Sequence, residues 1–446
     1  MRISTTQIYA AGLVGMEQNQ SQVLKLQNRI ASGRRILTPA DDPVAAARVL
    51  EVTQTKDVAA EYARNQGDAS NRLGMIDDQL TALTDLLQSV RSRTVQAANT
   101  VLSDSDRVAI ATELQARLDE MLGIANSRSA EGDYLFSGYQ GTAIPFVRTA
   151  ASSTSTSSSV AYFGDDGERL LQVSPSQQLA ANIAGSDLFM NVREGNGNFS
   201  TAAGGNGPGL PNQGTGMIDA GSLLDRQKWQ GALNNDSLWQ GSSQREVQIR
   251  FSSVAGVSSY QLFDASTNAP PAAPLAPRAI GPVQSFTPGQ TIPVVNSTTT
   301  PPTDFGAQVV IDGSPVDGDT FIVKPSANKS MFQTVQEMLD LLRSPVDSGT
   351  ARTAFSVQMQ AHLNNLDQAL ANVGRVQATV GARLQVLDGL SSSSSALDVQ
   401  YQQTLSGLQD LDYAQAISDF TRQQTSLEAA QKSFVQIAGL SLFKYL

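Results

Sequence analysis

Apolar residues recur at alternating steps of three and four along two long stretches, 73–101 and 359–387. Such spacing places one narrow apolar row along a helix, as in the seam of a coiled coil. A helix over 43–102 would be about 90 Å long and could not bury its row without a partner. We therefore predict that the two helices cover each other. The positions of the two rows are Leu73, Ile76, Leu80, Leu83, Leu87, Val90, Thr94, Ala97 and Val101, and Met359, Leu363, Leu366, Leu370, Val373, Gln377, Val380, Leu384 and Leu387.

A shorter helix is predicted to follow the first long helix and to return antiparallel to it. The segment 103–106 offers side-chain oxygens for a helix N-cap, and Asp106 suits the positive end of the helix dipole. The three-four spacing then continues, and we expect this helix to end near Asn126. Its apolar positions are Ala111, Leu114, Leu118, Met121 and Ala125.

The middle of the chain has a different pattern, which predicts β structure. Apolar and polar residues alternate along 247–251, and a second apolar run at 260–263 follows a turn at Gly256. The runs 309–311 and 320–323 flank Asp312-Gly313, which predicts a hairpin with a loop longer than two residues. Glycine, proline and small polar residues predict surface loops over 195–216, 268–277 and 296–304.

These patterns predict a mainly α fold: a long antiparallel helical bundle or coiled coil made from both chain ends, with a β-rich inserted outer domain. Terminal helices over 1–42 and 403–446 would form one domain, and residues 43–150 and 329–402 the helical bundle. Residues 151–328 would form the insertion.

The two ends carry thinner apolar stripes, interrupted by polar residues and glycine. Short helices with so little apolar surface are marginal in water without packing. We therefore expect both ends to become ordered only when a neighbouring subunit covers their stripes. The expected assembly interface comprises Met16, Val23, Leu26, Ile30, Ile417, Phe420, Leu427 and Phe434, with Arg34 and Arg35 at the end of the first stripe.

Composition narrows the range of functions. The chain has 446 residues, of which 31 are basic and 41 acidic, and its net charge of −10 argues against general nucleic-acid binding. There is no cysteine and one histidine, so disulfides, thiolate chemistry and His-pair metal motifs are excluded. No apolar run is long enough to insert into a membrane. We expect no catalytic residue, metal or cofactor.

The first 40 residues contain five basic groups and only Glu17 as an acid, a local charge of +4. They lack a continuous apolar segment followed by a cleavage site, so we expect no cleaved secretory signal. An organelle transit peptide is disfavoured because the helical pattern runs on through this segment.

Several motifs have both a functional and a structural interpretation. Asp41 and Asp42 could act as a carboxylate pair, but Pro43 after them favours a helix start with an N-cap. Trp229 and Trp239 could stack on a sugar, although isolated aromatic residues more often anchor a small core.

His362 flanks an apolar row, which favours a packed or surface histidine over a catalytic one. The Arg34-Arg35 pair is either solvated or in contact with an acidic neighbour in another subunit. The serine run 391–395 is either a flexible joint or a helical stretch of small residues.

The sequence resembles a known family at both ends. The segment LQNRIASGRRILTPADDPVAAARVL (26–50) resembles the N-terminal signature of the bacterial flagellin superfamily, and DLDYAQAISDFTRQQTSLEAAQKSFVQIAGLSLFKYL (410–446) resembles its C-terminal helix. Three inner stretches are more similar to the hook–filament junction branch, the hook-associated protein 3 family, than to filament flagellin. They are EGDYLFSGYQGTAIPF (131–146), RLLQVSPSQQLAANIAGSDLFMNV (169–192) and GDTFIVKPSANKSMFQTVQEMLDLL (318–342).

The resemblance implies a non-enzymatic structural subunit of the bacterial flagellum. Such proteins form a ring that joins the hook, through hook-associated protein 1, to the flagellin filament. They are exported without a cleaved signal, and an export chaperone holds the C-terminal helix beforehand. The implied location is extracellular, and the implied partners are further copies of the chain, hook-associated protein 1, flagellin and the chaperone.

Three other functions remain open at this stage. A filament flagellin would polymerise by itself, which a junction subunit would not do. An enzyme or adhesin could reside in the inserted domain, although a single histidine weakens the case for a hydrolase. A coiled-coil signalling rod is disfavoured because no transmembrane segment is present.

Overall fold

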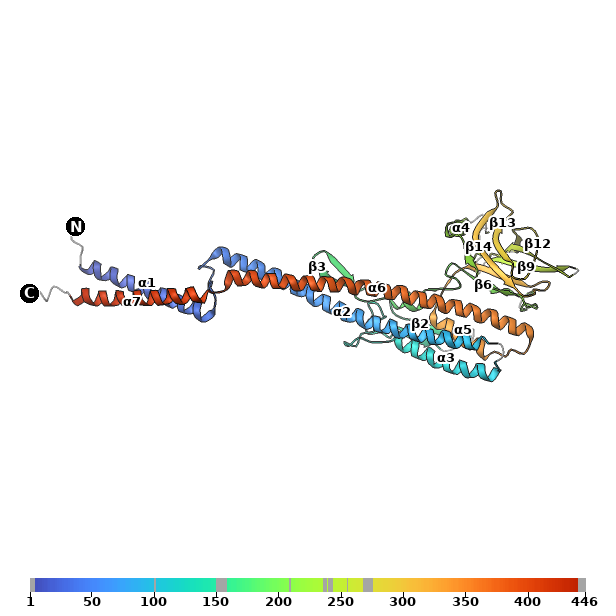
Figure 1. Cartoon of the computed structure of the whole chain (residues 1–446), viewed down its shortest axis with the longest axis horizontal. Helices are drawn as coiled ribbons and strands as arrows, with labels where there is room; N and C mark the ends of the chain where they lie inside the picture. Colours follow the sequence, from blue (N-terminus) through green and yellow to red (C-terminus); the bar gives the residue numbers. More distant parts are fainter. Residues whose placement is uncertain are drawn as a thin grey trace, which may run out of the picture. The chain divides into compact units, whose positions relative to one another are not determined.

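The computed structural model describes residues 5–99, 102–149, 159–207, 210–235, 239, 244–254, 256–267 and 276–439. The chain divides into two compact units, a terminal unit and a central unit (Figure 1). The terminal unit comprises residues 1–67, 172–177 and 387–446, and the central unit comprises 68–171 and 178–386. The helices are α1 (Thr5–Ser32), α2 (Pro43–Ala97), α3 (Asp104–Ala125), α4 (Arg226–Leu233), α5 (Met331–Arg343), α6 (Gly349–Gln409) and α7 (Tyr413–Gly439), with the π-helix η1 (Ser186–Met190).

In the central unit, α2, α3, α5 and α6 form a helical bundle. The predicted apolar row of α2 lies in the core of this bundle, since every position of that row from Leu73 to Ala97 is at most 1% exposed. Val101 lies outside the described residues. On α6 every second position of the predicted row is buried (Met359, Leu366, Val373, Val380 and Leu387), and the positions between them are half-buried.

Polar contacts fix the antiparallel register of α2 and α6. Arg91 Nε donates to Asp367 Oδ1 at 2.6 Å, and Gln377 Nε2 donates to Thr81 Oγ1 at 3.4 Å. The predicted pairing of the two long helices is therefore confirmed. The first helix is shorter than expected, because α2 ends at Ala97 rather than near Leu102.

The start and the end of α3 were both predicted correctly. Ser103 is the N-cap, and its hydroxyl and the Asp106 carboxylate form a reciprocal capping box. Asn126 is the C-cap. The apolar face of α3 packs against α5, whose buried side chains include Met338 and Leu339. An aromatic cluster of Phe136, Phe146, Phe189 and Phe332 extends this core, with neighbouring ring centroids 5.1–5.5 Å apart.

The inserted region is β-rich, as predicted. A six-stranded antiparallel sheet has the order β11-β10-β9-β15-β6 with β12 also on β10, and a second sheet has the order β13-β14-β7 with β8 also on β14. Their strands are β6 (Phe199–Ala203), β7 (Met217–Ile218), β8 (Ser222–Leu223), β9 (Val247–Val254), β10 (Val257–Asp264), β11 (Arg278–Ala279), β12 (Gln284–Ser285), β13 (Thr291–Asn296), β14 (Thr303–Asp312) and β15 (Thr320–Pro325). Three further pairs are β1 (Phe146–Thr149) with β2 (Ser159–Tyr162), β3 (Leu170–Ser174) with β4 (Gln177–Ala180), and β5 (Val192–Arg193) with β16 (Asn328–Lys329).

The apolar faces of the two larger sheets share one core with α4. Trp229 and Trp239 are each 1% exposed, with their rings 5.3 Å from Phe199 and 5.2 Å from Phe305. They therefore anchor this core, and the alternative of a sugar-stacking platform is wrong.

The predicted hairpin of 309–311 with 320–323 is also wrong. Those runs belong to β14 and β15, which lie in different sheets. The buried Asp319 carboxylate accepts hydrogen bonds from the N–H groups of Gln213, Gly214 and Val316 at 2.8–3.0 Å. These bonds organise the connection so that the chain crosses from one sheet to the other.

The glycine-rich stretch 195–216 was expected to be a loop, but it contains β6, which pairs with β15. Phe199 of β6 is fully buried, and its aromatic ring holds this part of the stretch in the sheet. The expected loop 296–304 is confirmed only for residues 297–302, which connect β13 to β14, because Asn296, Thr303 and Asp304 belong to those strands. Of the third expected loop, 268–277, residues 268–275 lie outside the described part.

In the terminal unit, α1 packs against α7, and the first part of α2 runs beside the last part of α6. The β3–β4 turn contacts α2, since Asn65 and Gln66 donate to the carbonyls of Gln172 and Val173 at 2.9 and 2.7 Å. Gln66 also donates to Ser394 on α6 at 3.1 Å. The serine run 391–395 is therefore helical, inside an unbroken α6.

Candidate assembly interface

The helices α1 and α7 lie side by side and antiparallel, so that residues 5–32 pack against residues 413–439 (Figure 1). Asn19 lies opposite Gln423, whose amide donates to the Asn19 carbonyl oxygen at 2.9 Å. At the inner end of the pair, the N–H of Leu411 donates to the carbonyl of Gly33 at 3.0 Å. The two terminal stripes thus meet within one chain.

The seam between α1 and α7 is only partly covered. Among the described side chains of the two helices, Ala416 alone is buried, with 4% of its surface exposed. Ile417 is 52% exposed. This contrasts with the fully buried row of α2 and fits two helices that bury little apolar surface on their own. The half-buried members of the expected interface are Met16, Val23, Leu26, Ile30, Phe420, Leu427 and Phe434.

A second set of apolar residues on these helices was missed in the sequence. Leu13, Val14 and Leu24 are about half exposed on α1, and Val435 is 68% exposed on α7. The sequence could have indicated this second set through the doublets Leu13-Val14 and Val23-Leu24. Adjacent residues point to different sides of a helix, so two apolar neighbours indicate apolar surface on more than one side. The pair therefore presents apolar surface outward as well as along its seam.

The exposed apolar surface extends to the other helices of the terminal unit. Val44 and Leu50 on α2 are 68% and 70% exposed, and Val399 on α6 is 53% exposed. Scattered single residues would need no explanation, but a repeated series along one unit is typical of an interaction surface.

The arginine pair lies where α1 meets the segment before α7. Arg35 donates its N–H to the carbonyl of Gln409 at 2.7 Å and its guanidinium to that of Leu408 at 3.0 Å. Arg34 forms an antiparallel bridge with Asp410, and its side chain is exposed. Arg35 thus binds within its own chain, and Arg34 remains accessible to a neighbour.

The two aspartates before α2 have different structural roles. Asp41 accepts hydrogen bonds from the N–H groups of Leu37 and Thr38, and the bond from Thr38 in particular holds the Asp41 pKa below its ordinary value. Asp42 accepts from the N–H of Ala45 at 3.0 Å, which is N-cap geometry ahead of Pro43 at the first helical position.

Sequence reasoning missed a matching cap on the other helix. The Asp412 carboxylate accepts from the N–H groups of Ala414 and Gln415 at 3.0 and 3.1 Å, at the start of α7. An aspartate just before the apolar spacing begins was the available signal. No group of three or more potential metal-binding His, Asp or Glu side chains occurs within the part of the chain that the structure describes.

Gly33 permits the turn directly after α1, where the α1–α7 pair ends. Its φ is +68°, and an added Cβ would lie 2.9 Å from the Tyr413 hydroxyl. Gly33→Ala is expected to destabilise the α1–α7 pair by about 1–2 kcal/mol, since both the backbone conformation and the contact become strained. This loss of stability is measured as faster amide hydrogen exchange across α1 and α7. The matched control is Gly15→Ala, which meets nothing within 4 Å and lies inside a helix, so unchanged or slower exchange is expected there. Equal exchange in both variants would contradict this role of Gly33.

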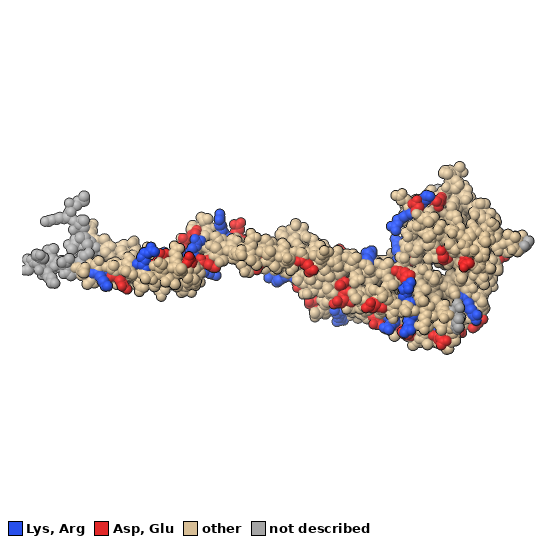
Figure 2. Space-filling model, in the orientation of Figure 1, with Lys and Arg blue, Asp and Glu red and all other residues tan. Residues whose placement is uncertain are grey.

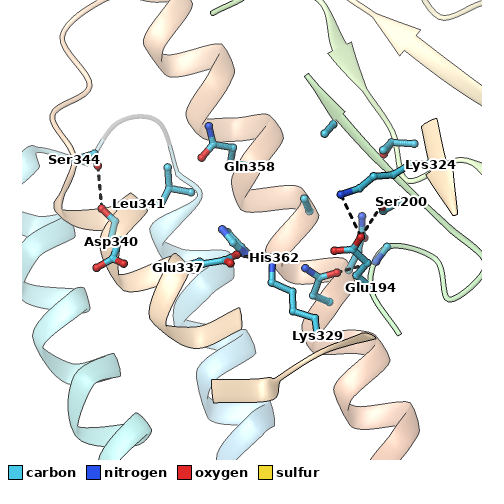
Figure 3. Close-up of a pocket in the computed structure, with 16 residues that line it drawn as sticks. Glu194, Ser200, Lys324, Lys329, Glu337, Asp340, Leu341, Ser344, Gln358 and His362 are labelled. Carbon is cyan, nitrogen blue, oxygen red and sulfur yellow. Dashed lines mark hydrogen bonds and ion pairs between the residues drawn. The ribbon is translucent and has the colours of Figure 1, made fainter. Parts of the chain in front are cut away.

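His362, the single histidine, lies far along the sequence from these residues, on α6 in the central unit. It is 8% exposed and lines a cavity together with Lys329 and Glu337 (Figure 3). Burial lowers its pKa to about 4, so the imidazole is neutral at pH 7. Of the two expected alternatives, a packed or a surface histidine, the structure shows the packed one.

An antiparallel pair of terminal helices, a helical bundle and an inserted β region define a fold class of the flagellin type. Residues 3–141 match the bacterial flagellin N-terminal helical region, and residues 363–446 match the bacterial flagellin C-terminal helical region. The chain belongs to the flagellin superfamily.

Individual relatives identify the branch of that superfamily. Flagellar hook-associated protein 3 of Escherichia coli (strain K12) is 22% identical over 445 residues, which cover 100% of this chain and 99% of that protein. The crystal structure of flagellar hook-associated protein 3 from Legionella pneumophila is similar with a TM-score of 0.66 and 25% identity, over 81% of this chain and 98% of that one. Phase 1 flagellin of Salmonella naestved is 30% identical over only 117 residues, or 26% of this chain and 23% of that flagellin.

The chain is therefore a flagellar hook–filament junction protein, an extracellular structural component rather than an enzyme. The alternative of a filament flagellin is disfavoured, because the match to hook-associated protein 3 of Escherichia coli covers 100% of this chain and the match to Phase 1 flagellin of Salmonella naestved covers 26%. In the described residues, no helix combines the length and the apolar character needed to cross a bilayer.

Proposed function

We propose that the chain forms a ring in which the α1–α7 pair is the inner assembly element. Residues 1–42 and 403–446 would contact neighbouring copies, hook-associated protein 1 on the hook side and flagellin on the filament side. Before export, a chaperone would cover the C-terminal helix. The observation that carries the proposal is the thin seam of the α1–α7 pair, in which only Ala416 is buried among the described side chains.

The physical argument compares two seams in the same chain. The bundle seam from Leu73 to Ala97 is closed by contacts within one copy. The terminal seam has half-buried residues and outward apolar ones, so each copy keeps apolar area that an adjoining subunit can cover. Burying such area provides the main favourable free energy of protein association. Assembly is thus favoured at the ends and not at the bundle.

Removing residues 424–446 tests the proposal, because it deletes the outer part of α7 from Gln424 onward, which is more than half of that helix. The truncated chain is expected to keep the bundle and the β region, since neither contains those residues, and to lose its ability to attach filaments to hooks. Circular dichroism and tryptophan fluorescence check folding, and electron microscopy of flagella from a complemented deletion strain checks attachment. Normal filaments in that strain would exclude the proposed role of the terminal pair.

A further inference from the structure

A cavity of about 520 Å³ lies in the central unit between the helices α5 and α6 and the strands β6 and β15 (Figure 3). Its volume falls within the usual range of small-molecule sites, which combine apolar surface with a few placed polar groups. Carboxylates, amines, amides and hydroxyls line it together, and the junction function uses none of them.

The charges on the cavity wall largely neutralise one another. Lys324 lies 3.5 Å from Glu194, and Lys329 lies 2.5 Å from Glu337. Asp340 adds a third carboxylate to the lining. Two ammonium groups thus face three carboxylates, which disfavours an anion, and both ammonium groups are already engaged with carboxylates. Asp340 already accepts a hydrogen bond from Gln336 Nε2 at 3.2 Å, so each of these charged groups has a partner and a neutral polar ligand breaks none of the pairs.

His362 adds a buried polar group that lacks a partner. Its Nδ1 is buried and makes no hydrogen bond to any described residue. A neutral imidazole has one donor and one acceptor nitrogen, and a flip about its broadly two-fold ring torsion exchanges the positions of Nδ1 and Cδ2. A hydroxyl group in the cavity can satisfy either nitrogen because it both donates and accepts.

Amide groups surround the histidine. Asn364, Asn365 and Gln358 of α6 line the same cavity, and the Asn365 carbonyl oxygen accepts from the N–H of Gly195 at 2.8 Å, which fixes that side chain. Groups that can donate and groups that can accept therefore line one space, and such a lining suits a ligand with several hydroxyl groups.

We propose that this cavity binds a small neutral polyhydroxylated ligand, a mono- or disaccharide, with a hydroxyl paired to His362. This site is separate from the buried Trp229 and Trp239, and no phenylalanine, tyrosine or tryptophan is among its lining residues. Affinity comes from hydrogen bonds alone, so binding is weak and depends on the shape of the cavity.

The single histidine provides a direct test, because its ring signals in a nuclear magnetic resonance spectrum need no assignment. Full-length chain with 13C-labelled histidine is titrated at pH 7 with glucose, sucrose and dextran, and separately with sodium acetate and tetramethylammonium chloride. Saturable shifts with glucose or sucrose are expected, and none with either salt. A response to dextran as well would identify the end of a glycan chain rather than a free sugar as the ligand. No saturable sugar response, or a larger response to acetate or to the ammonium ion, would overturn the proposal.

Two variants in which an alanine of α6 is replaced by phenylalanine test whether the sugar binds in this cavity. Ala361 of α6 lines the cavity, so Ala361→Phe should fill part of it and weaken sugar binding about tenfold. The matched control, Ala371→Phe on the exposed face of the same helix, should bind as the parent chain does. Circular dichroism checks that both fold. If Ala361→Phe does not fold, Lys324→Met replaces it, because that side chain is 46% exposed and lines the same cavity. Unchanged sugar affinity in the folded cavity variant would place any binding elsewhere and overturn the proposal.

Discussion

Leu83→Asp is expected to lower the free energy of unfolding by about 4 kcal/mol, because it places an unpaired carboxylate in the closed seam of the bundle. Leu83 is fully buried on α2. Urea denaturation followed by circular dichroism measures the change. The control on the same helix is Ala82→Asp, whose side chain is exposed and whose effect should be within about 0.5 kcal/mol.

The same substitution at Leu427 should behave differently. Leu427 is half-buried on α7, so Leu427→Asp leaves its charge in contact with water and should cost the isolated chain less than about 1 kcal/mol. It should nevertheless prevent incorporation into the flagellum, because the neighbouring subunit would have to bury the charge. Similar losses of stability in Leu83→Asp and Leu427→Asp would contradict the distinction between a folding seam and an assembly seam.

Acidification from pH 7 to pH 5 is expected to destabilise the chain by about 2 kcal/mol through His362 alone. The ordinary pKa of histidine is near 6.5, whereas burial lowers that of His362 to about 4 in the folded chain. The unfolded chain therefore takes up a proton at a higher pH than the folded chain does. The contribution of the neutral histidine is fully present above pH 6.5 and is lost as the pH falls toward 4.

Two charged groups act on His362 in opposite directions. Glu337 of α5 raises its pKa and Lys329 lowers it, and both effects are smaller than that of burial. His362→Gln should remove the difference in stability between pH 7 and pH 5, because a glutamine does not titrate there. Urea midpoints for the parent chain and the variant at both pH values measure this. An equally steep loss in the variant would show that His362 does not control stability in that range.

Local rules account for the elements that the sequence predicted well. The row from Leu73 to Ala97 and the capping box at Ser103 depend on residues within a few positions of one another. A helix repeats its geometry every few residues, so its apolar face and its caps can be recognised from residues that are close together in the sequence. The same reason explains why the start of α2 at Pro43 could be expected from the residues around it.

The β region was less predictable because its pairing joins distant residues. The alternation at 247–251 identified β9 as a strand, but no local signal stated that β15 rather than β14 would lie beside it. The burial of Asp319 among backbone N–H groups decides where the chain crosses between sheets. Contacts of this kind depend on the folded arrangement, and no periodic pattern of apolar residues in the sequence indicates them.

By itself the sequence determined that both chain ends form helices, that two long apolar rows cover each other, and that the middle is β-rich. Each of these features could be predicted because it depends on the spacing of apolar residues along the chain. Only the tertiary structure decided that the terminal stripes meet in one antiparallel pair with Ala416 as its one buried described side chain, and that His362 borders a polar cavity. Burial and cavity shape depend on which surfaces meet in space, and spacing along the chain does not contain that information.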